Sequence, residues 1–402
     1  MVGKLNKKSR LFAALVAVLT SGCGGVMGAA APQGTAGIVG PAGPADAKDP
    51  AGVSAPPTRF YGYAMSTLAN TILVIDSSDN TIVKRVKHPD LVRPANGKFH
   101  PNQKRFYASG VGRVTVWDTT DLANPVHLKT ITPSAGSTGE YRGVHVYKGS
   151  KTATDGDVYW GNIQDGKVYV YRAADLEGAN PTPVQVFDTA TDGIVGPHYF
   201  LTRPNTNEVW LTLRTATTNG KLIRIDGDTR TIITTPTATL ETTKTPGDEP
   251  TEFAFSRDGA RAYIGHHGNT ITGSPTNSSA LVVVDANTFT VAKTLHTAPG
   301  YATPAFVDFD WDLGRIYLTT KWSPALVVFD IKTERILRYI DLGGYGPAYG
   351  VYTAPDKKTL YLTLGPPAQA AVVVLDVKTL TITANIADTD LNQPRAVRFT
   401  HY

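Results

Sequence analysis

Cysteine is almost absent from this sequence, since Cys23 is the only one among 402 residues. A lone cysteine excludes an intramolecular disulfide, so an exported chain of this size has to be stable through its hydrophobic core alone. A Cys-x-x-Cys-His haem attachment, a Gly-x-Ser-x-Gly nucleophile motif, a P-loop and a dinucleotide fingerprint are also missing. Nucleophilic hydrolysis and covalent haem attachment therefore have no motif to support them.

Positive charge is only in small excess, and much of it lies at the N-terminus. Lysine and arginine number 39 and aspartate and glutamate 34, which gives a formal net charge of +5. The first 22 residues hold four basic residues and no acidic one, so the remainder carries only +1. Such a chain has no basic surface for nucleic acid, and we expect no nucleic-acid partner.

The first 22 residues have the pattern of a bacterial lipoprotein signal peptide. Lys4, Lys7, Lys8 and Arg10 precede the apolar run "LFAALVAVLT", and "TSGC" then ends in Cys23. That run is too short and too early for a membrane-spanning helix. We expect lipid on Cys23 to anchor the chain on the periplasmic or cell-surface side of a bacterial membrane. The alternative is an ordinary cleavage region that happens to contain a cysteine.

Alanine, glycine and proline make up 22 of the 34 residues in 23–56, and the segment shows no apolar periodicity. They have too few large side chains to bury, so the pattern predicts a lipid-anchored disordered linker. A segment of this length would hold the domain of residues 57–402 on the order of 30 Å from the lipid.

One alternating strand recurs seven times from Arg59 onward. The copies read "RFYGYAM", "RFYASG", "DVYWGN", "EVWLTL", "RAYIGHH", "RIYLTT" and "TLYLTL". Each is followed by a second strand, and in six of the seven an aspartate opens the next turn. These aspartates are Asp76, Asp118, Asp226, Asp285, Asp330 and Asp376. We expect their carboxylates to bond the backbone two residues on and tighten each hairpin.

A third element precedes the strand pair in only six copies, and the missing copy is at the C-terminus, "QPRAVRFTHY". If the C-terminal segment lies in the first sheet, beside residues 59–90, all seven strand pairs have a third element and the sheets close into a ring. The sequence therefore predicts an all-β fold, a seven-bladed β-propeller whose C-terminal strand closes the first blade. We expect this domain to be a monomer.

The run "PTEFAFSRDGARAYI" from Pro250 to Ile264, followed by "VVVDANTFTV", resembles the bacterial YVTN-type propeller repeat. That repeat is similar in turn to the haem domain of cytochrome-type nitrite reductases. The resemblance covers roughly residues 57–402 and is clearest in the last three blades. It implies the fold and export, but no single activity, because such propellers are found as enzymes, carriers and adhesive surface proteins.

Histidines give one candidate site. Repeat register places several imidazoles and one carboxylate near the central channel, where they could bind Zn²⁺ or Cu²⁺. This set is His198, His266, His267, His145 and Glu252. The alternative is that His266 and His267 only begin a polar loop, with one imidazole bonded to a backbone carbonyl.

A second candidate site combines cations with aromatic rings around the channel face. Its members are Arg142, Tyr141, Arg214, Lys321, Trp322, Tyr345, Tyr349 and Arg395. Arginines pair with carboxylates and flat rings cover planar ligands, so this set would suit a haem-type tetrapyrrole, a sugar acid or an acidic peptide. The alternative is that the tyrosines pack between blades and the arginines are solvated.

Three functions remain open at this stage. The first is a lipid-anchored, non-enzymatic binding propeller that offers its channel to a small anionic ligand, a metal or a protein. The second is an enzyme or cofactor-assembly factor that uses a bound metal, a tetrapyrrole or a histidine and glutamate as base and acid. The third is an adhesive surface protein.

Overall fold

The computed structural model describes most of the chain from Arg59 onward. The described residues are 59–134, 136–149, 155–214, 220–233, 238–239, 248–269, 280–297, 304–320, 323–365 and 370–400. The chain divides into two units, Met1–Asp49 and Pro50–Tyr402. The predicted signal peptide, Cys23 and the predicted linker of residues 23–56 all lie outside the described residues.

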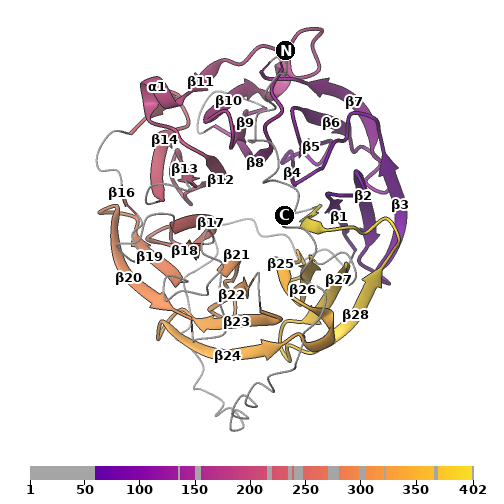
Figure 1. The fold of residues 1–402 in the computed structure, drawn as a ribbon, viewed down its shortest axis with the longest axis vertical. Helices are drawn as coiled ribbons and strands as arrows, with labels where there is room; N and C mark the ends of the chain where they lie inside the picture. The colour runs from indigo at the N-terminus through magenta and orange to yellow at the C-terminus, as the bar shows by residue number, and fades with distance from the viewer. Residues whose placement is uncertain are drawn as a thin grey trace, which may run out of the picture. The chain divides into compact units, whose positions relative to one another are not determined.

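Seven four-stranded antiparallel sheets, here blades 1 to 7 in chain order, surround a central axis (Figure 1). The innermost strands, from blade 1 to blade 7, are β29 (Pro394–Phe399), β4 (Asn96–Phe99), β8 (Tyr141–Tyr147), β12 (Pro197–Thr202), β17 (Asp248–Phe255), β21 (Pro304–Asp310) and β25 (Ala348–Thr353). The second strands are β1 (Tyr61–Ser66), β5 (Arg105–Ser109), β9 (Asp157–Asn162), β13 (Glu208–Leu213), β18 (Arg261–Asn269), β22 (Arg315–Thr320) and β26 (Thr359–Leu364).

The outer half of each blade follows the same order. The third strands are β2 (Thr71–Asp76), β6 (Val114–Asp118), β10 (Lys167–Arg172), β14 (Lys221–Asp226), β19 (Ala280–Asp285), β23 (Ala325–Asp330) and β27 (Ala371–Asp376). The outermost strands are β3 (Thr81–Lys87), β7 (Val126–Ile131), β11 (Gln185–Phe187), β15 (Thr231–Ile232), β20 (Thr290–His296), β24 (Arg335–Asp341) and β28 (Ile382–Ala387). Blade 4 adds β16 (Ala238–Thr239) beside β14.

Helical structure is confined to short turns in the described part of the chain. These turns are η1 (Ala173–Asp175), α1 (Thr189–Asp192) and η2 (Gly343–Tyr345). No helix among the described residues is long and apolar enough to cross a membrane.

The C-terminal strand closes the ring, as predicted. Strand β29 pairs antiparallel with β1, so that Arg398 lies opposite Tyr63 and Phe399 opposite Gly62. Beyond the strand, the backbone N–H of Thr400 donates to the carbonyl of Tyr61 at 3.0 Å. The two ends of the described chain are thus held in one sheet, and the predicted all-β, seven-bladed propeller is confirmed.

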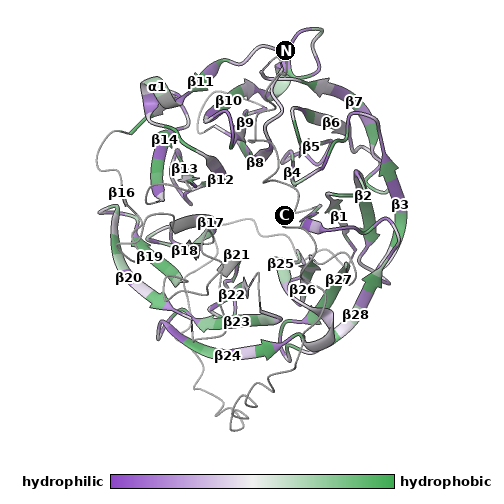
Figure 2. Cartoon of the chain, viewed as in Figure 1, coloured by the Kyte–Doolittle hydropathy of each residue, from purple (hydrophilic) through white to green (hydrophobic). Residues whose placement is uncertain are grey.

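The core lies between neighbouring blades. The alternating strands send large side chains to both faces of each sheet, where they meet the next blade. Tyr63 of blade 1, for example, packs its ring 4.7 Å from that of Phe99 and 4.9 Å from that of Phe106, both in blade 2. Hydrophilic residues interrupt the outermost strands β3, β7 and β28 instead, which face solvent (Figure 2).

Four of the turn aspartates bond the backbone two residues on, as predicted, whereas Asp330 and Asp376 bond it three residues on. In all six, Oδ1 accepts a hydrogen bond of 2.6–3.0 Å from a backbone N–H two or three residues further on. These bonds fix the hairpin between the third and outermost strands, so the aspartates are structural residues.

Candidate functional site

Strand register brings seven residues to one level of the central channel. In each blade, one residue of the innermost strand pairs with the aromatic residue of the second strand. These seven residues are Arg398, Lys98, His145, Leu201, Ala254, Asp308 and Tyr352, from blade 1 to blade 7. Equivalent register on equivalent strands places them at the same depth, so the channel carries a belt of polar side chains that Leu201 and Ala254 interrupt.

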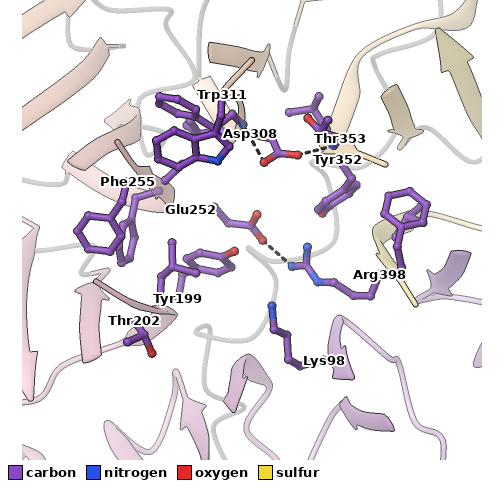
Figure 3. A pocket seen from close by; sticks show the side chains of 18 of the residues that line it. Lys98, Tyr199, Thr202, Glu252, Phe255, Asp308, Trp311, Tyr352, Thr353 and Arg398 are labelled. Carbon is purple, nitrogen blue, oxygen red and sulfur yellow. Dashed lines mark hydrogen bonds and ion pairs between the residues drawn. The ribbon is translucent and has the colours of Figure 1, made fainter. Parts of the chain in front are cut away.

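Blades 4 and 5 supply their polar groups from two residues earlier in the strand. Tyr199 precedes Leu201 and Glu252 precedes Ala254, and residues two apart in a strand share a face. We call the six side chains Lys98, Tyr199, Glu252, Asp308, Tyr352 and Arg398 the channel cluster (Figure 3).

The channel cluster lines a cavity of about 250 Å³. Six of the seven innermost strands contribute to its walls, and the cavity continues toward the ends of those strands, past Phe255, Phe309 and Trp311. Its volume is below the roughly 300–1,000 Å³ typical of sites for drug-sized ligands. The cavity therefore has room for a small molecule only.

Arg398 is the central cation of the cavity. Its Nε and Nη2 donate to Oδ1 of Asn96 at 2.9 and 2.7 Å, and Nε also donates to the carbonyl of Gly97 at 3.0 Å. Nη2 reaches Oε1 of Glu252 at 3.4 Å, and the guanidinium carbon lies 4.7 Å from the ring centroid of Tyr352. These contacts of Nε and Nη2 hold the guanidinium in place.

Glu252 is buried and Asp308 is half-buried, and both carboxyl groups hold their protons unusually tightly. Burial raises the pKa of Glu252 to about 7, against the opposing effect of Arg398, and the side chain is only 4% exposed. Burial likewise raises the pKa of Asp308 to about 6, although its carboxylate accepts from the backbone N–H groups of Phe309, at 2.8 Å, and Thr353. Both carboxyl groups can therefore exchange protons near neutral pH.

Lys98 and His145 complete the polar belt. Burial, together with the nearby charge of Arg398, lowers the pKa of Lys98 to about 8. Burial and the charge of Lys98 lower the pKa of His145 to about 3, so this imidazole is neutral at physiological pH. Its Nε2 lies 2.7 Å from Oγ1 of Thr202, a residue of the cavity wall. His145 therefore supports the wall and is not a cation of the site.

The tyrosines of the channel cluster remain protonated. Burial raises the pKa of Tyr199 and of Tyr352 above the usual value, and the charge of Glu252 adds to both effects. The hydroxyl of Tyr352 donates to the backbone carbonyl of Arg395 at 3.1 Å. The two rings thus supply flat apolar surface beside the charged groups.

Two predicted ligand-binding residues, Arg142 and Arg395, do come together, but nearer the beginnings of the innermost strands. Both donate to Glu140, from Arg142 Nη2 to Oε2 at 2.9 Å and from Arg395 Nη1 to Oε1 at 2.5 Å. Burial and the charge of Arg142 lower the pKa of Arg395 to about 10. Burial acts to raise the pKa of Glu140, but the charges of Arg142 and Arg395 outweigh it, so the pKa of Glu140 is lowered. This triad is separate from the residues that line the cavity.

The remaining predicted ligand-binding residues either do not line the cavity or lie outside the described residues. Tyr141 is fully buried, with its ring 6.2 Å from that of Tyr169 in the same blade, and Tyr345 packs against the core between blades 6 and 7. Tyr349 lies over Gly365, and Arg214 bonds the carbonyl of Gly196 through its backbone N–H at 2.8 Å. Lys321 and Trp322 lie outside the described residues.

The predicted metal set is only partly described. His198 and His266 are buried, at 6% and 0% exposure, and Glu252 and His145 occupy the channel as given above. The side chain of His267 lies outside the description. Among the described residues, the group with three possible ligand atoms within 4.8 Å of one another is instead His88, Asp90 and His127.

That outer group has a geometry unsuited to an ion. The rings of His88 and His127 are stacked, with centroids 3.7 Å apart and planes 20° from parallel, so their in-plane lone pairs do not converge. Asp90 is already bonded by Arg113 at 2.5 Å and by Thr130 at 2.8 Å. A structural packing role between blades 1 and 2 accounts for these contacts.

Of the channel residues described above, Glu252 and His145 were predicted from sequence, as metal ligands, whereas Lys98, Asp308, Arg398, Tyr199 and Tyr352 were not. Most of the predicted residues belong to the entry of the innermost strands or to the region between second and third strands, whereas the channel cluster stands inside the innermost strands. The available signal was a column of polar residues opposite the recurring aromatic of the second strand. These polar residues can be aligned with one another only if the register of each strand pair is known to within one residue.

Comparisons with known proteins support the fold. No family model and no curated protein matches the chain. Among solved structures, a functionally unknown protein from Desulfotomaculum acetoxidans DSM 771 is similar, with a TM-score of 0.62, 11% identity, and coverage of 85% of this chain and 99% of that one. Kuenenia stuttgartiensis hydrazine synthase is also similar, with a TM-score of 0.60, 12% identity, and coverage of 77% and 90%. At these identities the likeness concerns the fold alone.

Proposed function

We propose that this chain is a binding propeller whose channel cavity holds a small molecule bearing a carboxylate. The observation that carries the proposal is that two cations, Lys98 and Arg398, and two acids, Glu252 and Asp308, line one cavity. Taking charges out of water costs stability, and close partners of opposite sign offset that cost. A ligand with a carboxylate and a hydrogen-bond donor would add such partners for both signs.

The proposed ligand has two polar ends. Arg398 Nη1 and Lys98 would receive the carboxylate, because a guanidinium binds carboxylate through paired N–H groups. Glu252 and Asp308 would face a hydroxyl or ammonium group, to which a carboxylate can accept hydrogen bonds. The rings of Tyr199 and Tyr352 would cover the carbon skeleton between them.

Calorimetric titration with matched small acids tests this function. We expect the purified domain to bind lactate or alanine, which carry both polar ends, more tightly than propionate, which carries only the carboxylate. Replacement of Glu252 by Gln should reduce the preference for alanine over propionate by at least about tenfold, because it removes the acceptor charge. Replacement of the exposed Arg338 by Met serves as control and should change nothing. Absence of any binding by all three acids would refute the proposal.

A second candidate function is proton-transfer catalysis in the same cavity. The pKa values of about 7 for Glu252 and about 8 for Lys98 lie close to neutrality, which is the condition for an efficient acid and base. An enzyme would exchange the hydrogen next to the carboxylate of its substrate with solvent. Loss of the C2 proton signal of a bound amino or hydroxy acid in deuterium oxide, followed by NMR, would favour this function over binding alone.

The predicted cofactors receive unequal support. A haem-type tetrapyrrole is itself of drug size, and the cavity of about 250 Å³ is below the range for such ligands, so we propose no tetrapyrrole there. A Zn²⁺ or Cu²⁺ site at His198, His266 and His267 remains a prediction from sequence. Metal analysis of the purified protein would test it.

Export and lipid anchoring at Cys23 are proposals that rest on the signal-like N-terminus and on the resemblance to YVTN-type repeats. An anchored propeller would present its cavity to small molecules outside the cytoplasm. Mass spectrometry of the mature N-terminus tests the lipid. An adhesive surface role, the remaining alternative, would instead require binding to cells or matrix that is unaffected by the Glu252 substitution.

A further inference from the structure

Lys98 projects its amine into the cavity from a rigid piece of backbone. The neighbouring Gly97 lies against the ring of Phe106, so closely that an added Cβ would stand 2.2 Å from that ring, and its carbonyl is bonded by Arg398. Phe99, on the other side, is buried against Tyr63. The side chain of Lys98 points into the space between Tyr199 and Arg398 (Figure 3). Its amine therefore shares a small cavity with a guanidinium and two carboxyl groups.

The charge state of this amine favours reaction with electrophiles. With its pKa lowered to about 8, roughly a tenth of Lys98 is neutral at pH 7, against far less than a hundredth for an ordinary lysine. A neutral amine carries the lone pair that attacks a carbonyl carbon, which is how lysines form imines with carbonyl compounds. The protonated form of Glu252, with a pKa of about 7, lines the same cavity and can serve as an acid.

We propose that the cavity takes small 2-oxo acids, and that Lys98 forms a reversible imine with their carbonyl carbon while Arg398 holds the carboxylate. This inference rests on the proposed function, because it uses the same carboxylate contact. In a 2-oxo acid the carbonyl carbon is bonded directly to the carboxylate carbon. A guanidinium and an amine that line one cavity of about 250 Å³ can therefore reach both groups of a three- or four-carbon molecule.

The reaction balances without any further reagent. The lone pair of Lys98 Nζ forms a bond to the carbonyl carbon, and the carbonyl π electrons move to oxygen, which takes a proton from the carboxylic acid of Glu252. The nitrogen then returns a proton to that carboxylate, and the hydroxyl leaves as water after a second protonation. The carbon–nitrogen double bond forms as the carbon–oxygen bond breaks, and no oxidation occurs.

Pyruvate and lactate are a matched pair of probes, since they differ only in a carbonyl against a hydroxyl. The intact domain is incubated with pyruvate and sodium cyanoborohydride, which supplies hydride to any imine, and peptide mass spectrometry then locates the secondary amine. We expect labelling of Lys98 at least tenfold above that of exposed lysines such as Lys84. Replacement of Lys98 by Arg, which keeps the charge, should abolish that label, and replacement of Lys84 by Met should leave it unchanged.

The outcomes separate this inference from the proposed function. Binding of lactate without preferential labelling of Lys98 by pyruvate would overturn the imine and leave the carboxylate site standing. Failure of lactate to bind, together with even labelling of all lysines, would overturn both. Labelling of Lys98 by acetone as readily as by pyruvate would overturn the 2-oxo acid class, because acetone has no carboxylate for Arg398. Wild-type protein suffices for all three comparisons, so they do not depend on whether a variant folds.

Discussion

Arg398 and Glu252 meet inside the channel although 146 residues separate them in the chain, with Nη2 of the arginine 3.4 Å from Oε1 of the glutamate. One comes from the closing strand of blade 1 and the other from blade 5, so the contact spans the inside of the ring. The arginine is held by Asn96 and Gly97 of blade 2 as well. Three blades therefore share one charged contact, and its energetics should report on the integrity of the site.

Removal of Arg398 alone should be costly. The variant Arg398→Met leaves Glu252 in the cavity without its cation, which costs about 3–5 kcal/mol for a buried pair. The double variant Arg398→Met with Glu252→Gln should recover a large part of that loss, because the carboxylate that Arg398 contacts is removed as well. Urea unfolding measures each free energy, with Arg338→Met on the exposed face of β24 as the control. Equal losses in the single and double variants would contradict an energetic link between the two residues.

Glu252 should make stability depend on pH in an identifiable direction. Its pKa in the folded chain, about 7, lies above the ordinary value of about 4.3, so the folded state binds this proton more tightly. The resulting stabilisation is present at low pH and is lost as the pH rises through 7. Relative to Glu252→Gln, the wild type should lose roughly 2–3 kcal/mol between pH 4.5 and 7.5. Parallel stability curves for the two proteins would show that the carboxyl group is not held as described.

Gly97 should resist replacement because of the ring beside it. A Cβ at this position would lie 2.2 Å from the ring of Phe106, and the glycine carbonyl also accepts from Arg398. We expect Gly97→Ala to destabilise the domain by about 1–3 kcal/mol, the usual cost of overpacking. Gly344, with no heavy atom within 4 Å of such a Cβ, offers the matched control. Similar unfolding midpoints for Gly97→Ala and Gly344→Ala would count against the packing described.

Loss of the C-terminal strand should open the ring. Removal of residues 393–402 takes away β29, exposes the edge of β1 and deletes Arg398. We expect a chain that is either unfolded or associated through the open edge, because unpaired strand edges invite pairing. Removal of residues 401–402 alone keeps the whole of β29 and should leave a folded monomer. Circular dichroism and analytical ultracentrifugation distinguish these states, and a stable monomer from the longer deletion would contradict the closure.

The fold could be predicted from sequence because each blade repeats the same local sequence pattern. The recurring aromatic of the second strand, the turn aspartates and the missing seventh element fixed blade number and closure without any tertiary information. The site could be predicted only in part. Glu252 and His145 were reached through the register of the repeats, whereas Lys98 and Asp308 are single substitutions inside otherwise ordinary strands. Their meaning depends on contacts between blades, which no local pattern encodes.

The position of Arg398 on the closing strand has a consequence for biosynthesis. The ribosome makes blades 2 to 7 in full before it reaches the residues that complete blade 1, so the nascent chain lacks the guanidinium until synthesis is nearly finished. If the proposed function holds, binding of a small molecule can begin only after the finished polypeptide has left the ribosome's tunnel and β29 has paired with β1. A prematurely terminated product would then lack the proposed site as well as the closed ring.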